Sequence, residues 1–186
     1  MSQRQSFSYP QREPHDSPQL ISPKMSLQQA AEIACRVVPD IDAGKLEWYP
    51  LCGVIFRVEA TRGPARRLDG QLLFAAVDRA TGEAFTTEPW PEQAEPLGCS
   101  KVQPPRNTAD ADVSADYRLS LEEAVAAARK AVATALVRRV RLAARFELHF
   151  QRVVDPLWKP NWYFVGAKQR VLVDGLTGEF AVVKRG

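Results

Sequence analysis

The hexapeptide Asp-Arg-Ala-Thr-Gly-Glu at residues 78–83 returns, with two changes, as Asp-Gly-Leu-Thr-Gly-Glu at residues 174–179. Each copy lies between two apolar runs, a pattern typical of a strand, a tight turn and a second strand. Aspartate caps the amide groups of its own loop, and glycine suits the left-handed backbone that ends such a turn. We therefore assign a structural role to six turn residues: Asp78, Thr81, Gly82, Asp174, Thr177 and Gly178.

A helix signal precedes each turn. Ser26 and Ser120 each open a capping box, because Gln29 and Glu123 stand three residues further on. Apolar residues at helical spacing follow both serines. The sequence therefore predicts one helix ahead of each pair of apolar runs.

The spacing between matching positions is nearly constant. The two cap serines are 94 residues apart, as are Phe56 and Phe150, and the two turn aspartates are 96 residues apart. We interpret this as two copies of a helix–strand–strand–turn–strand unit, with a net insertion of two residues in the second copy. The predicted fold class is α+β, with two repeated units that each pack one helix on a three-stranded antiparallel sheet.

The predicted organisation has four parts. Residues 1–24 form a flexible tail, 25–88 the first unit, 89–116 a proline-rich linker and 117–186 the second unit. In the second unit, alternating apolar and polar residues at 140–150 predict a long strand. Residues 155–160, which contain two prolines, predict a loop, and 161–174 the next strand. Each unit is small enough that docking of the two, or homodimerisation, is expected to cover its exposed surface.

Composition restricts the class of protein. The chain has 186 residues, of which 45% are hydrophobic and 25% charged, and a formal charge of +3. So small a charge does not by itself demand a nucleic acid or an anionic membrane as partner. No apolar run is long enough to span a membrane, and residues 1–24 lack the core of a signal peptide. From these features we expect a cytoplasmic protein.

Catalytic and metal-binding motifs are not evident. The three cysteines, Cys35, Cys52 and Cys99, are far apart, and so are the two histidines, His15 and His149. Neither set has the spacing of a zinc site or of a disulfide framework. We therefore predict a protein that is not an enzyme and that holds no metal or other cofactor.

The order of these signals resembles the PepSY-type domain. The resemblance rests on Ser-Leu-x-x-Ala at residues 26–30 and 120–124, and on Val-Asp-x-x-Thr-Gly-Glu at 77–83 and 173–179. It implies a helix packed across an antiparallel sheet and a non-catalytic role, such as modulating a peptidase or another partner protein. Members of that family are often extracytoplasmic, whereas this sequence shows no export signal.

A protein or peptide partner is the leading functional hypothesis. Aromatic residues beside prolines and a lysine form two groups that are typical of binding surfaces. The alternative interpretation is that these aromatics close the ends of small cores. The proposed binding residues are Trp48, Tyr49, Trp158, Lys159, Trp162 and Tyr163.

Two other functions remain open. A cleft between helix and sheet would suit a small molecule. Single-stranded nucleic acid, which we rank third, would suit the arginines near the long strand of the second unit. These arginines are Arg138, Arg139, Arg141, Arg145 and Arg152.

Overall fold

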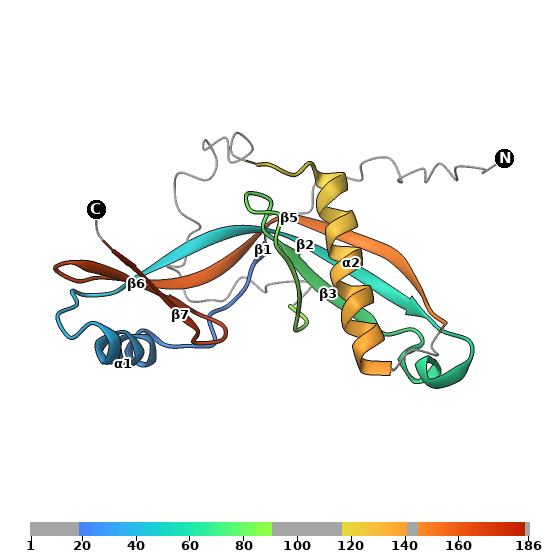
Figure 1. The fold of residues 1–186 in the computed structure, drawn as a ribbon, viewed down its shortest axis with the longest axis horizontal. Coiled ribbons are helices and arrows are strands. Elements are labelled where there is room, and N and C mark those ends of the chain that lie inside the picture. The colour runs from blue at the N-terminus through green and yellow to red at the C-terminus, as the bar shows by residue number, and fades with distance from the viewer. Residues whose placement is uncertain (1–18, 91–116, 141–144, 185–186) are drawn as a thin grey trace.

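One sheet runs through the whole molecule (Figure 1). The computed structural model describes residues 19–90, 117–140 and 145–184. In chain order its elements are β1 (Gln19–Leu20), α1 (Leu27–Val37), β2 (Lys45–Glu59), the 3-10 helix η1 (Gly63–Leu68), β3 (Leu72–Val77), β4 (Ala84–Thr87), α2 (Leu121–Val140), β5 (Glu147–Val165), β6 (Gln169–Asp174) and β7 (Phe180–Lys184).

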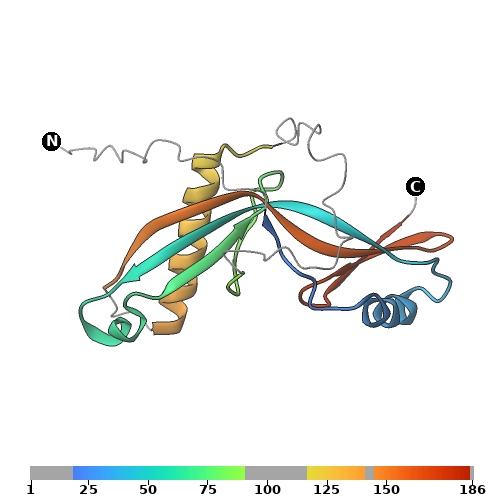
Figure 2. The same cartoon turned by 180° about the vertical axis from the view of Figure 1, so that it is seen from behind.

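The long strands β2 and β5 form the centre of the sheet. They pair antiparallel from Lys45 opposite Tyr163 to Glu59 opposite Glu147. The order of strands is β4-β3-β2-β5-β6-β7, and β1 joins β5 in parallel. The sheet twists and curls, so that β3 and β4 extend one end of the central pair while β6 and β7 extend the other (Figures 1 and 2).

Each helix packs on strands from the other half of the chain. Helix α1 lies at the β6 end, where Ala30 and Ala34 are buried against Val171 and Val173. Helix α2 lies at the β3 end, and the sheet stands in front of it in Figure 2. Both helices begin at a serine with a capping box, as predicted from residues 26–29 and 120–123.

The predicted fold class is therefore wrong. An antiparallel sheet with helices is present, but it is one continuous sheet and not two repeated helix-on-sheet units. Strands β2 and β5 come from different halves of the chain and pair along most of their length. Each helix packs on strands of the half to which it does not belong. Periodicity within a segment cannot show this, because it identifies an apolar face without identifying what covers that face.

The predicted elements of residues 140–174 also need correction. Helix α2 continues to Val140, and β5 begins only at Glu147. The strand then passes straight through the predicted loop at 155–160. Its register against β2 shifts between Leu51 and Gly53, opposite Asp155-Pro156. A bulge is one of the few places where a strand tolerates proline, which explains why β5 does not end there.

Three apolar clusters form the core of the described part of the chain. The largest packs α2 and η1 on one face of β2, β3 and β5, through residues such as Phe56 and Val132. A second lies on the opposite face, where Trp90 covers Ile55 and Leu157. The third packs α1 on β5 and β6. Successive side chains of β2 point to opposite faces, which explains why this strand contributes to both the first and the second cluster.

Two predicted segments are only partly described. Within the predicted tail, Gln19–Leu20 form β1, and Lys24 makes an ion pair with Glu88. Of the predicted linker, Trp90 is buried in the core, while residues 91–116 lie outside the described part of the chain. Neither described helix has the length and apolar character that crossing a bilayer requires.

Candidate interaction surface

The repeated turns have closely similar geometry. Oδ1 of Asp78 accepts hydrogen bonds from the amides of Ala80 and Thr81, at 2.8 and 3.2 Å. Oδ1 of Asp174 accepts the equivalent bonds from Leu176 and Thr177, at 2.8 and 3.3 Å. The glycines that end the turns have φ of 84° at Gly82 and 77° at Gly178. In both turns the aspartate and the glycine therefore determine the conformation of the loop.

Each turn also holds the segment that leads into the helix of the other half. The amides of Lys24 and Met25 donate to the carbonyl of Gly175, at 2.9 and 3.1 Å. The amides of Arg118 and Leu119 donate to the carbonyl of Arg79, at 3.0 and 3.1 Å. The turns therefore fix where α1 and α2 begin, in addition to closing their hairpins.

Strand alternation separates the proposed binding residues into two groups. Residues opposite one another in antiparallel strands share a face, and alternate residues along a strand share it too. Tyr49 is opposite Lys159, and Tyr163 is four pairs further along, on the same face. The other face of the same strands carries the tryptophans Trp48, Trp158 and Trp162.

The tryptophans make internal contacts. Trp158 is only 4% exposed, and β1 pairs beside it. The indole Nε1 of Trp162 donates to the carbonyl of Met25 at 2.9 Å, and its ring packs with the α1 cluster. Trp48 is half-buried. These contacts correspond to the alternative interpretation, in which the aromatics close small cores.

The opposite face remains accessible. Lys45, Tyr163, Leu172 and Ala181 form one row across β2, β5, β6 and β7. Tyr49 and Lys159 lie on the same face, four pairs further along the β2–β5 ladder. We call these six residues the tyrosine face. Among the described residues, no helix packs on it, because α1 covers the other side of these strands. Tyr49 is 39% exposed, and the ammonium group of Lys45 lies 5.0 Å from the centre of the Tyr163 ring.

Two carboxylates stabilise this face electrostatically. The phenol of Tyr49 donates to Oδ2 of Asp78 at 2.9 Å, and Nζ of Lys159 lies 2.5 Å from Oδ2 of Asp174. Burial alone would raise the pKa of both aspartates, but these partners and the turn amides outweigh it and hold both pKa values below their usual range. Burial and the bond to Asp78 raise the pKa of Tyr49 to about 12. At neutral pH Tyr49 is therefore a neutral phenol that can donate to Asp78.

Sequence reasoning missed an ion pair at the middle of the molecule. Nη1 of Arg79 lies 2.5 Å from Oδ2 of Asp155, and both side chains are largely buried. The guanidinium group also lies 4.0 Å from the centre of the Tyr117 ring and donates to the carbonyl of Leu119. The sequence held one signal of this ion pair: the first turn has Arg79 at the position where the second turn has Gly175. This cluster joins the first turn, the β5 bulge and the start of α2.

The thiol next to this ion pair is poorly suited to nucleophilic chemistry. Cys52 is fully buried, and burial together with the negative charge of Asp155 raises its pKa to about 12. Thiolate, the nucleophilic form, is therefore scarce at neutral pH. Cys35 is exposed on α1, and Cys99 lies outside the described residues.

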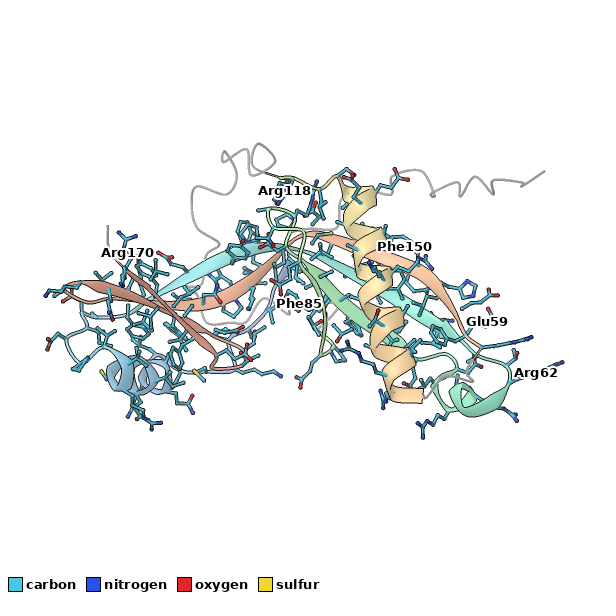
Figure 3. All side chains as sticks on the ribbon, viewed as in Figure 1. Glu59, Arg62, Phe85, Arg118, Phe150 and Arg170 are labelled. Atoms are coloured by element: carbon cyan, nitrogen blue, oxygen red, sulfur yellow. The ribbon has the colours of Figure 1, made fainter. Side chains whose placement is uncertain are left out.

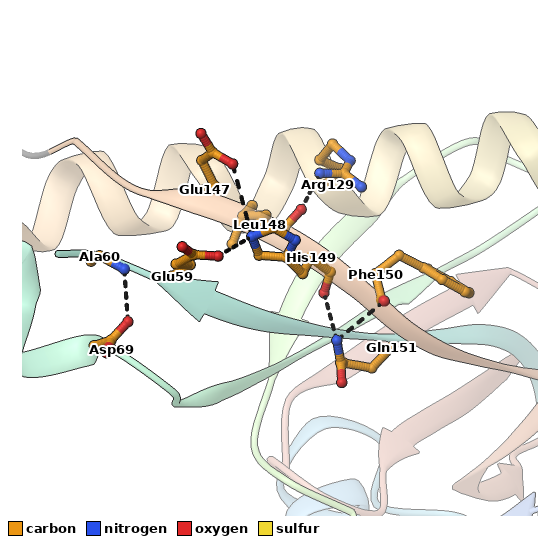
Figure 4. Close-up of polar contacts among 9 residues, drawn as sticks. All are labelled: Glu59, Ala60, Asp69, Arg129, Glu147, Leu148, His149, Phe150 and Gln151. Carbon is orange, nitrogen blue, oxygen red and sulfur yellow. Dashed lines mark hydrogen bonds and ion pairs between the residues drawn. The ribbon is translucent and has the colours of Figure 1, made fainter. Parts of the chain in front are cut away.

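The one described histidine has carboxylate neighbours at the far end of the sheet (Figure 4). Nε2 of His149 lies 2.7 Å from Glu59 and 3.8 Å from Glu147, and all three side chains are substantially exposed. Within residues 19–90, 117–140 and 145–184, no group of three histidine, cysteine or carboxylate side chains could hold a metal ion.

Comparisons with other proteins give no relative from which a role could be transferred. No family model, no curated protein and no solved structure matches this chain.

Proposed function

We propose that this protein is a non-catalytic interaction module that binds a protein partner on the tyrosine face. The observation that carries the proposal is a sheet face with partly exposed tyrosine and leucine side chains, which no described helix covers. Tyrosine offers a large apolar area together with a polar tip, and interfaces are enriched in it. The resemblance to PepSY-type domains supports a peptidase, or another protein, as the partner.

The arrangement of charge supports a polar rim around an apolar centre. Tyr163, Leu172 and Ala181 are neighbours across β5, β6 and β7, Lys45 follows Tyr163 on β2, and Lys159 lies four residues from Tyr163 along β5. Lys159 is held by its ion pair, so little side-chain entropy is lost when a partner binds beside it. Lys45 already pairs with Glu47 and Lys159 with Asp174, so a partner surface with a shallow apolar patch and few charges fits this pattern best.

A quantitative capture experiment tests the proposal. Proteins retained by the wild type would be compared with those retained by Tyr163→Ala/Leu172→Ser. The matched control is Leu72→Ser/Val137→Ser, which removes exposed apolar side chains at the other end of the molecule. We expect the captured partner's affinity to fall at least about tenfold in the face variant alone, as for truncation of central aromatic contacts. Equal retention by the face variant and the wild type would contradict the proposal.

A second candidate function rests on a different observation. Exposed arginines lie on η1, just before it and on the last turn of α2, elements that contribute Ala65, Leu68 and Leu136 to one buried cluster. Figure 3 shows Arg62 projecting from the η1 end of the molecule. The arginines are Arg62, Arg66, Arg67, Arg138 and Arg139. Guanidinium groups pair well with phosphate oxygens, so this end suits the backbone of single-stranded nucleic acid.

Fluorescence anisotropy with an oligothymidine tests this candidate. Binding should weaken steeply between about 50 and 200 mM salt, and the dependence should become shallower in Arg66→Ala/Arg67→Ala. The control is Arg170→Ala, which removes an exposed arginine at the opposite end (Figure 3). Absence of binding at low salt, or an equal effect of the control, would remove nucleic acid from consideration.

A further inference from the structure

Strand β7 is an edge strand with unusual exposure. All five of its residues are exposed, including Phe180 at 51%, Val182 at 39% and Val183 at 57%. Proteins protect such edges with prolines, bulges or charges in the middle of the strand. Residues 180–183 have none of these, because their register with β6 is continuous and Lys184 is the strand's one charge. The strand is therefore suited to pairing with another strand.

The direction of the backbone groups follows from the turn. The amide of Asp174 donates to the carbonyl of Glu179, which makes this the first hydrogen-bonded pair of the hairpin. Hydrogen-bonded and non-hydrogen-bonded pairs alternate along an antiparallel ladder. Ala181 and Val183 therefore bond to β6. The amides and carbonyls of Phe180, Val182 and Lys184 point away from the sheet.

We propose that β7 pairs antiparallel with β7 of a second copy of this chain, with Val182 on the two-fold axis. In a two-fold antiparallel pair that keeps the sheet continuous, one residue must face its own copy. A register centred on Val182 pairs all three residues whose backbone groups point outward, because Val182 then faces itself and Phe180 faces Lys184. A register centred on Ala181 or Val183 would pair only two of the three.

The side chains are self-complementary in this register. Phe180 lies opposite Lys184, and Ala181 lies opposite Val183. Phe180, Val182 and Lys184 share the face that α1 covers on β6, so the lysine chain lies over the aromatic ring of the other copy. No charge stands opposite a like charge within the paired strands. Because the side chains of β7 are complementary to those of a second β7, another copy of this chain fits the edge better than an unrelated peptide.

The other edge of the sheet is a weaker candidate. Strand β4 has four residues, and α2 packs against it. Pairing through β7 would produce one sheet that runs through both copies, with the two tyrosine faces on the same side. A single strand pair buries a modest area, so we expect a dissociation constant on the order of 10–100 µM.

Analytical ultracentrifugation of the full chain tests the proposal. The wild type should change from monomer to dimer between about 5 and 500 µM, a range that spans the expected constant. Val182→Pro should stay monomeric with unchanged circular dichroism, because it removes only an outward amide, which edge strands tolerate. Val182→Lys, which places two like charges on the axis, should also stay monomeric. A monomeric wild type, or dimerisation of both variants as in the wild type, would overturn the proposal.

Cross-linking tests the register itself. Val182→Cys, in a chain with Cys35→Ser and Cys99→Ser, should form a covalent dimer with a short bis-maleimide. Val137→Cys in the same background is the control, because Val137 is exposed on α2 away from β7. Equal cross-linking at the two positions would contradict the register. Partner binding by the tyrosine face is a separate readout, since it does not require dimerisation.

Discussion

Tyr49 and Lys159 lie opposite each other in the β2–β5 pair, and each holds the aspartate of a different turn. Tyr49 donates to Asp78 in the first turn, and Lys159 pairs with Asp174 in the second. The two turns thus dock onto the same point of the central strands from opposite directions. Since each turn also binds the start of one helix, this pair connects both ends of the molecule.

The two contacts should differ in strength. Lys159→Met removes a charged partner from Asp174, whose side chain is 15% exposed, and should lower the free energy of unfolding by about 1.5–3 kcal/mol. Tyr49→Phe removes a neutral donor at a more exposed position and should cost about 1 kcal/mol or less. Urea unfolding at pH 7 measures both values. A loss for Tyr49→Phe as large as that for Lys159→Met would contradict the assignment.

Acid should weaken the turns. Because Asp78 and Asp174 have pKa values below their usual range, their contribution to stability is complete above the unfolded value of about 4 and is lost as pH falls through the folded values. Asp78→Asn/Asp174→Asn should be less stable than the wild type at pH 7, and the difference should shrink towards pH 3. Urea unfolding across this range provides the measurement. A difference that is constant with pH would exclude this linkage.

Gly175 should be sensitive to a single added methyl group. A Cβ there would lie 2.7 Å from the carbonyl oxygen of Pro160, which also accepts the Gly175 amide at 3.0 Å. Gly175→Ala must therefore move the backbone of β5 or of the turn and should cost about 1–3 kcal/mol. Thermal unfolding monitored by circular dichroism measures the effect. An unchanged melting temperature would show that the turn does not dock so closely.

The cysteines should differ in reactivity. Cys52 is buried and has a pKa of about 12, whereas Cys35 is exposed. In native protein at pH 8, iodoacetamide should modify Cys35 and leave Cys52 unmodified until the chain is unfolded, because alkylation requires an accessible thiolate. Peptide mapping by mass spectrometry measures both sites. Similar rates at the two cysteines would contradict the buried position of Cys52.

Local signals in the sequence predicted local structure well. The capping serines and the strands beside the turns are present, because hydrogen bonds between near neighbours determine them. The spacing argument failed for the long strands. Val77 pairs with Cys52, and its counterpart Val173 pairs with Trp162, so Trp162 is the counterpart of Cys52. Phe56 and Phe150, which are 94 residues apart, are not equivalent positions of two units. They pair with each other in the neighbouring strands β2 and β5, with ring centroids 6.4 Å apart.

The candidate surface could be predicted only in part. The aromatic pattern selects Tyr49, Lys159 and Tyr163 as candidates, but it groups them with tryptophans that strand alternation places on the other face. The loop prediction at residues 155–160 hid this alternation, because it treated Trp158 and Lys159 as neighbours in a turn. Exposure of β7 depends on what lies beside it in the sheet, which its own apolar composition does not reveal.

Exchange of the helices between the two halves is the central claim, and methyl NOEs test it most directly. In selectively labelled protein, the methyl groups of Ala30 and Ala34 should show NOEs to Val171 and Val173, because these residues form one buried cluster. A helix packed on the strands of its own half would instead show NOEs to Ala75 and Val77. The first result would establish that α1 covers the C-terminal strands, and the second would contradict the account.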